Sequence, residues 1–160
     1  MPNFNSGKSA YQAYSLGTSG QSVQSNGNFT KTGDAQSSQY ILRNTTADAT
    51  VTSLFVNGSS GKVALVPNSA VNFLVQVVAR DAAGNAAFYA LSGGIKQGAN
   101  AAATAIVGTI SQTVKAEDQA AWDATAIADT TLGALDIRVT GAAATNIKWV
   151  ATVETVEVAY

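Results

Sequence analysis

The chain has 160 residues, of which 46% are hydrophobic and 12% are charged, and it contains neither cysteine nor histidine. The length suits one domain of ordinary size. Without cysteine there is no disulfide framework or thiolate metal site, and without histidine the usual general base near neutral pH is missing. The composition therefore argues against an enzyme.

The 9 basic and 10 acidic residues give a formal net charge of −1. The basic residues are scattered singly, whereas a nucleic-acid-binding surface needs them clustered. The apolar runs are shorter than the roughly 20 residues that cross a bilayer, and no apolar run follows Lys8 as a signal peptide would require. We therefore expect a protein made in the cytoplasm, with neither nucleic acid nor a membrane as its partner.

Residues 1–33 differ from the rest because they are rich in serine, glycine, asparagine and glutamine. Such a segment lacks the periodic apolar face of a packed element, and a disordered tail is one interpretation. Its isolated aromatic side chains favour another, since aromatic residues spaced along a polar strap can anchor it in a neighbour's pockets. We predict an extended assembly arm with four contact residues: Phe4, Tyr11, Tyr14 and Phe29.

From residue 34 onward, apolar and polar side chains alternate with the period of β-strands. Strands are expected to begin at residue 40 and to cover residues 51–56, 62–66, 70–80, 86–91, 95–97, 104–110, 122–128, 135–140 and 147–158. Residues 81–85 have the glycine and asparagine of a hairpin turn, and Gly93 and Gly94 are expected to end a strand. Residues 99–105 and 117–121 can each hold one helical turn. The pattern predicts an all-β domain over residues 34–160, an antiparallel β-sandwich of jelly-roll or immunoglobulin-like type.

The final predicted strand changes its apolar parity. Trp149 and Val153 share one face with Ile147, but after Glu154 the apolar residues are Val156 and Val158, at positions of the other parity. A change of parity within one run usually indicates a β-bulge or a strand that moves between sheets. We therefore predict an irregularity after Glu154.

Four aspartates in one stretch are the strongest remaining candidates for metal binding or acid–base chemistry: Asp118, Asp123, Asp129 and Asp136. A calcium loop would need the D-x-[DN]-x-[DN]-G spacing, which is missing. We interpret these residues as turn residues and as solubilising side chains of an outer face. No catalytic, cofactor-binding or metal-binding residue is assigned, and no cofactor is expected.

Trp122 and Trp149 allow two interpretations. Exposed, they would form a stacking platform for a sugar; within alternating strands, tryptophan more often belongs to the core. We predict that both lie in the core.

Four blocks of sequence carry a resemblance: AQSSQYILRNTTADAT, LFVNG, FLVQVVARDAAGNAAFYALSGGI and WDATAIADTTLGALDIRVTGAAATNIKWVATVETVEV. Together they resemble a β-sandwich module of tailed-bacteriophage virion proteins. The resemblance covers residues 35–157, and the last block is its most specific part. The family brings no catalytic residues to these positions.

The resemblance implies a non-catalytic structural protein, located in the virion and made in the cytoplasm of a bacterial host. A small sandwich with an arm fits a capsid decoration or cement protein that forms a homotrimer or another symmetric oligomer and binds the major capsid protein. A small tail or fibre component that binds tail proteins is an alternative, as is a carbohydrate- or receptor-binding module of a phage adhesin. Such contacts act by avidity across many symmetric copies.

Overall fold

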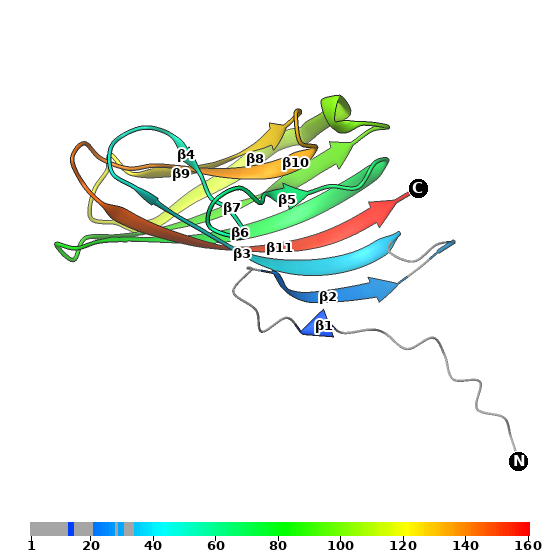
Figure 1. Cartoon of the computed structure of the whole chain (residues 1–160), viewed down its shortest axis with the longest axis horizontal. Coiled ribbons are helices and arrows are strands. Elements are labelled where there is room, and N and C mark those ends of the chain that lie inside the picture. Colours follow the sequence, from blue (N-terminus) through cyan, green and yellow to red (C-terminus); the bar gives the residue numbers. More distant parts are fainter. Residues whose placement is uncertain (1–12, 15–20, 28, 31–33) are drawn as a thin grey trace, which may run out of the picture.

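The computed structural model describes residues 13–14, 21–27, 29–30 and 34–160, and for residues 13–14 and 21–26 it describes the backbone alone. The described residues contain no α-helix, and their strands form two antiparallel sheets that pack against each other (Figure 1). The predicted all-β class and antiparallel sandwich are therefore confirmed.

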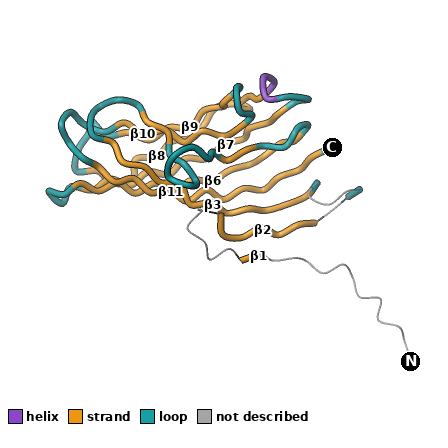
Figure 2. The backbone as a smooth tube through the Cα atoms, in the orientation of Figure 1, coloured by secondary structure: helices purple, strands orange, loops and turns teal. Residues whose placement is uncertain are grey.

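The larger sheet has seven strands in the order β1-β2-β3-β11-β6-β7-β8. They are β1 (Ala13–Tyr14), β2 (Gln21–Gly27), β3 (Ala35–Thr46), β6 (Ser69–Asp81), β7 (Ala86–Gln97), β8 (Thr104–Glu117) and β11 (Ile147–Ala159). Along β6, buried and exposed side chains alternate without interruption, because successive side chains of a strand point to opposite faces. The backbone of β2, which belongs to the predicted arm, pairs with β3 and so extends this sheet (Figure 2).

The smaller sheet is built around β10 (Ala134–Thr140). One side of β10 pairs along its whole length with β9 (Asp123–Asp129). The two short strands β4 (Thr52–Ser53) and β5 (Val63–Ala64) also pair with β10, near its opposite ends. Figure 1 shows this sheet lying over the larger one, so that one face of the larger sheet is covered and the other is not.

The core fills the space between the two sheets. Its largest fully buried side chains include Trp149, Tyr89, Phe73, Leu42, Leu54, Leu135 and Ile137. Trp149 lies at its centre, with its ring 6.5 Å from the ring of Tyr89 and 5.9 Å from that of Trp122. The core positions on β6, β10 and β11 are those that the period-two alternation predicts.

The predicted strand end at Gly93 and Gly94 is wrong. β7 continues through both glycines to Gln97, because β6 pairs with it along this whole length. The glycines serve packing instead: a Cβ at Gly93 would lie only 3.1 Å from Cζ of Phe73. The irregularities lie instead in the pairing of β7 with β8, whose register shifts between Phe88 and Tyr89 and between Ser92 and Gly94 of β7.

The predicted irregularity after Glu154 is also wrong. β11 keeps one register against both β3 and β6 to its end. Thr155 stays buried on the inner face, where its hydroxyl donates to Oε1 of Glu157 at 2.6 Å. Thr155 and Glu157 therefore occupy the inward positions as a hydrogen-bonded polar pair, and Val156 and Val158 point outward to solvent.

The connections agree in part with the expectations. The hairpin between β6 and β7 is confirmed, with Gly84 at φ +99° and the backbone N–H of Asn85 donating to Oδ1 of Asp81. Of the two expected helical turns, residues 99–105 contain the 3-10 helix η1 (Ala101–Ala103), whereas residues 117–121 contain the end of β8 and a turn but no helix.

Candidate assembly surface

The uncovered side of the larger sheet, here called the outer face, is the candidate site. It is formed by the side chains that point away from the smaller sheet, at even positions of β6, β7 and β11 and odd positions of β3. An antiparallel sheet with one solvated face normally alternates apolar inward and polar outward residues. The outer face departs from that rule.

A row of apolar side chains crosses three neighbouring strands of the outer face. Val150 of β11 stands opposite Val78 of β6, and Val78 stands opposite Phe88 of β7. Their side chains are 46%, 46% and 41% exposed. The three residues therefore form one continuous apolar row on the surface rather than isolated exposures.

A shallow trough runs along β7 beyond this row. Its floor consists of the small residues Ala90, Ser92 and Gly94, and the larger Leu74 of β6 stands beside it. Two hollows of about 240 Å³ and 350 Å³ lie along it, the second lined by Gly94 and Val107. A Cβ at Gly94 would meet no atom closer than 3.7 Å, so the missing side chain is what opens the floor.

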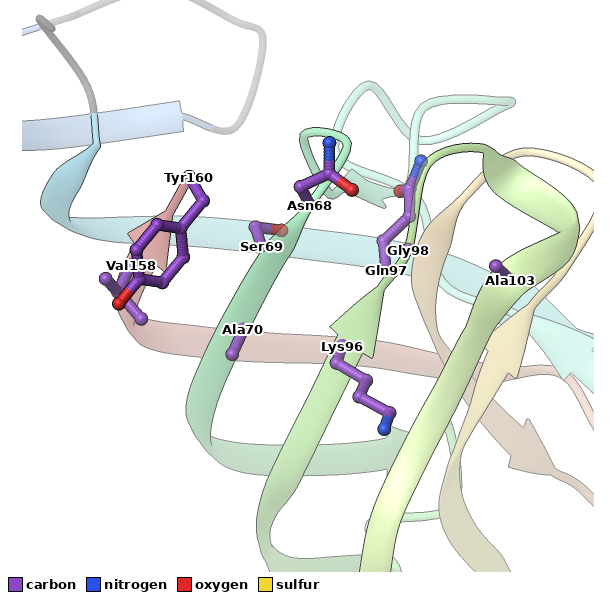
Figure 3. Close-up of a pocket in the computed structure, with 9 residues that line it drawn as sticks. All are labelled: Asn68, Ser69, Ala70, Lys96, Gln97, Gly98, Ala103, Val158 and Tyr160. Carbon is purple, nitrogen blue, oxygen red and sulfur yellow. The ribbon is translucent and has the colours of Figure 1, made fainter.

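A further hollow of about 460 Å³ lies at the end of the sheet (Figure 3). Figure 3 shows Tyr160 and Val158 on one side of it and Ala103 on the other, with Ala70 and Lys96 between them. Lys96 is the charged side chain among its described lining residues, which also include the polar Asn68 and Gln97. The hollow adjoins the outer face, because Ala70, Lys96 and Val158 line it.

The outer face is also basic. Within the described residues its strands carry five basic side chains against one carboxylate, that of Glu154, and Asp118 lies just beyond the end of β8; the basic residues are Arg43, Arg80, Lys96, Lys115 and Lys148. All of these except Arg43 lack a hydrogen-bond or ion-pair partner among the described residues. Arg80 and Lys148 stand directly opposite each other, an arrangement that is unfavourable for like charges.

In the smaller sheet, by contrast, basic side chains are paired with carboxylates. Nζ of Lys62 lies 2.8 Å from Oδ2 of Asp129 and 2.9 Å from Oδ2 of Asp136, and Nε of Arg138 lies 2.8 Å from the same Asp136 oxygen. Burial opposes the charge of Lys62, but the hydrogen bonds to both aspartates outweigh it and raise the pKa of this amine. The hydrogen bond from Lys62 lowers the pKa of Asp129. This cluster joins the segment before β5 to β9 and β10.

The four predicted aspartates therefore do not converge on one site. Asp129 and Asp136 meet at Lys62, while Asp118 accepts from the backbone N–H of Ala86 and Asp123 accepts from the side-chain amide of Gln112. The interpretation of Asp136 as a solubilising residue is wrong, because its side chain is fully buried. Within the described residues no group of three carboxylates that could hold a metal ion is found.

Both tryptophans lie in the core, as predicted. Trp122 is 2% exposed and Trp149 is 1% exposed. Nε1 of Trp149 donates to Oγ1 of Thr46 at 2.9 Å, whereas Nε1 of Trp122 has no partner among the described residues. Neither ring can present a stacking face to a sugar at the surface.

The predicted arm contacts are described in part. Phe4 and Tyr11 lie outside the described residues, and Tyr14 is described only by its backbone, which pairs with Val23. Phe29 is 77% exposed. Its backbone N–H donates to Oδ1 of the buried Asp34 at 2.7 Å, so an exposed aromatic ring projects from a turn that a buried carboxylate holds.

The outer face was not predicted from the sequence. The signal was present as pairs of consecutive apolar residues, such as Val77 with Val78 and Trp149 with Val150, which place one apolar side chain on each face of a strand. Period-two alternation explains the inward member of each pair and leaves the outward one unexplained.

Within the part of the chain that the structure describes, no helix has the length and apolar character of a membrane span. No protein-family model matches the chain, and it matches no curated protein and no solved structure.

Proposed function

We propose that this chain is a non-catalytic structural protein that assembles with other protein subunits through its outer face. The observation that carries the proposal is the row of Val78, Phe88 and Val150, each more than 40% exposed on a sheet whose other face is covered. Continuous apolar patches on a protein surface mark interaction sites more often than they occur by accident.

The proposed setting is the virion of a tailed bacteriophage, where the protein would decorate and stabilise the capsid. Support for this setting comes from the resemblance of residues 35–157 to virion β-sandwich modules and from the low charge of the chain. A cement protein acts through many identical weak contacts, for which a broad, shallow apolar face is suited. A small tail or fibre component would use the same surface.

A receptor- or carbohydrate-binding function has less support. The aromatic platform that it would need cannot come from Trp122 or Trp149, since both are buried. The shallow hollows of the outer face are lined by alanine, serine, glycine and valine rather than by aromatic rings.

The proposal is tested by the incorporation of variants into particles of the phage that encodes the chain. Val150→Glu places a charge in the apolar row, and Val51→Glu makes the same change on a loop, where Val51 is 56% exposed. Mass spectrometry of purified particles should find the wild type and Val51→Glu at equal copy number, and Val150→Glu reduced at least about tenfold.

Circular dichroism and thermal unfolding of both variants would establish that they fold. Undiminished incorporation of Val150→Glu would contradict the role of the outer face, and absence of the wild-type chain from particles would contradict the virion setting. Antibody labelling on heads supports decoration, whereas labelling on tails or fibres supports the alternative.

A further inference from the structure

We infer that the outer face binds the outer face of a second copy. The two-fold axis lies in the plane of the contact, runs parallel to the strands, and passes over the boundary between β6 and β7. The inference rests on the proposed assembly role of this face and names its partner. In such a contact, a residue on one side of the axis in one copy meets the residue of the second copy that lies at the same height on the other side. The strand register makes this requirement testable residue by residue.

The centre of the outer face has the shape that such a contact needs. Beside the trough of β7, the strand β6 presents a ridge of Asn72, Leu74 and Gln76, and Leu74 stands opposite Ser92 in the register. Rotation about an axis between the two strands places the ridge of each copy over the trough of the other. Leu74, which is 53% exposed, then lies over Ser92 of the second copy.

The apolar residues match in the same way. Val78 and Phe88 stand on either side of the axis at the same height, so Val78 of one copy meets Phe88 of the other. Farther out, Val156 of β11 and Val107 of β8 lie one strand beyond β6 and β7, in the row of Asn72 and Gly94. Rotation brings Val156 of each copy over Val107 of the other, and both side chains are more than 50% exposed.

One pair of charges is also complementary. Arg80 of β6 has Lys148 of β11 on one side of it and Ala86 of β7 on the other. Asp118 follows next, because its backbone N–H donates to the carbonyl oxygen of Ala86. The axis passes between Arg80 and Ala86, so Lys148 meets Asp118 of the second copy. Lys148, which lacks an acidic partner among the described residues of its own chain, gains one.

Sheets packed face to face lie about 10 Å apart with strands inclined by about 30°, which this arrangement permits. The contact closes on itself and predicts a dimer or a larger assembly with an even number of subunits. It replaces the homotrimer that the resemblance implies with a two-fold unit.

The absence of cysteine from the chain allows a direct crosslinking test. A chain carrying both Val107→Cys and Val156→Cys should form a disulfide-linked dimer on mild oxidation, because each new thiol faces its counterpart in the second copy. Within one chain the two positions lie three strands apart, about 14 Å, which is too far for a disulfide. Val156→Cys alone is the matched control and should stay uncrosslinked under the same oxidant.

Charge reversal supplies a second test that does not depend on crosslinking. Lys148→Glu and Asp118→Lys should each raise the dimer dissociation constant about tenfold in sedimentation velocity, and mixing the two variants should restore wild-type affinity. In the mixed dimer, one ion pair is re-formed with exchanged signs and the other is the wild-type pair. Lys96→Glu is the matched control, because Lys96 would face Ala70 of the second copy, and it should change the constant by less than about threefold.

A wild-type chain that remains monomeric at about 100 μM would overturn the inference, as would a disulfide-linked dimer of the Val156→Cys control. Failure of the mixed variants to re-associate would overturn it as well. None of these outcomes would contradict the proposed function, which is judged by the incorporation of Val150→Glu into particles.

Discussion

The ammonium group of Lys62 lies 2.9 Å from the carboxylate of Asp136, whose side chain has no solvent exposure. A buried carboxylate is stable only while its charge is compensated, and here Lys62, Arg138 and the hydroxyl of Ser53 all contact the same oxygen, Oδ2. The segment before β5 is thereby fixed to the middle of the smaller sheet by one side chain.

Removing this ammonium should destabilise the fold strongly. Lys62→Met keeps the length of the side chain but leaves two carboxylates with one fewer cation, and we expect a loss of about 2–4 kcal/mol of unfolding free energy. Urea unfolding measures it. Lys115→Met, at an exposed lysine without a partner among the described residues, should change the value by less than about 0.5 kcal/mol. Equal effects of the two substitutions would show that the Lys62 contacts do not stabilise the fold.

The same contact makes stability depend on pH. The pKa of Asp129 is lowered by its hydrogen bond from Lys62, so the folded state releases this proton more readily than the unfolded state. The stability that the ionised carboxylate of Asp129 contributes is complete above the unfolded pKa of about 3.9. This stability is lost as the pH falls through the lower, folded pKa. Unfolding free energy should therefore fall as the pH drops from about 3.9 through the lower, folded pKa, and it should fall less steeply in Lys62→Met. Parallel pH profiles for the two proteins would refute this account.

The buried indole of Trp149 requires its partner. Thr46→Val replaces the hydroxyl by a methyl group of similar size and leaves the Nε1–H of Trp149 unsatisfied, at an expected cost of about 1–3 kcal/mol. Thr45→Val, on the neighbouring exposed position of β3, is the control and should be neutral within about 0.5 kcal/mol. Thermal unfolding compares them; a neutral Thr46→Val would mean that the indole finds another acceptor.

Two glycines should respond oppositely to the same substitution. Gly133 has φ +67°, and a Cβ there would lie 2.7 Å from Oε1 of Gln97, so Gly133→Ala should cost about 1–3 kcal/mol. At Gly94 the substitution to Ala meets no close atom and should leave the fold as stable or slightly more so. Chemical denaturation checks both, and a destabilising Gly94→Ala would contradict the open floor of the trough.

The turn that presents Phe29 depends on Asp34. Its carboxylate accepts from the backbone N–H groups of Phe29 and Thr30, both at 2.7 Å. Asp34→Ala should speed hydrogen exchange of these two amides and cost about 1–2 kcal/mol. Phe29→Ala should leave both exchange and stability unchanged, because the ring is exposed, while reducing assembly if the ring is an anchor. Unchanged exchange in Asp34→Ala would place the stabilisation of this turn elsewhere.

The fold class and most of the core could be predicted from the residues alone. Alternation of apolar residues in β6, β10 and β11 reflects a side-chain period of two, which each strand has irrespective of its neighbours. The burial of Trp149 and the hairpin after Asp81 followed from the same local rules. Local alternation could not show that β7 continues through Gly93 and Gly94, because pairing with β6 decided that point.

The role of the outward residues depends instead on contacts between strands that are distant in the chain. Whether Val78, Val150 and Phe88 are isolated or adjacent depends on the register of β11, β6 and β7, which pairs residues about 70 positions apart in the case of Val78 and Val150. The same holds for Lys62 with Asp136, and for the ridge of β6 beside the trough of β7. Alternation specifies the face on which a side chain lies, but register specifies its neighbours, and the proposed assembly surface consists of neighbours.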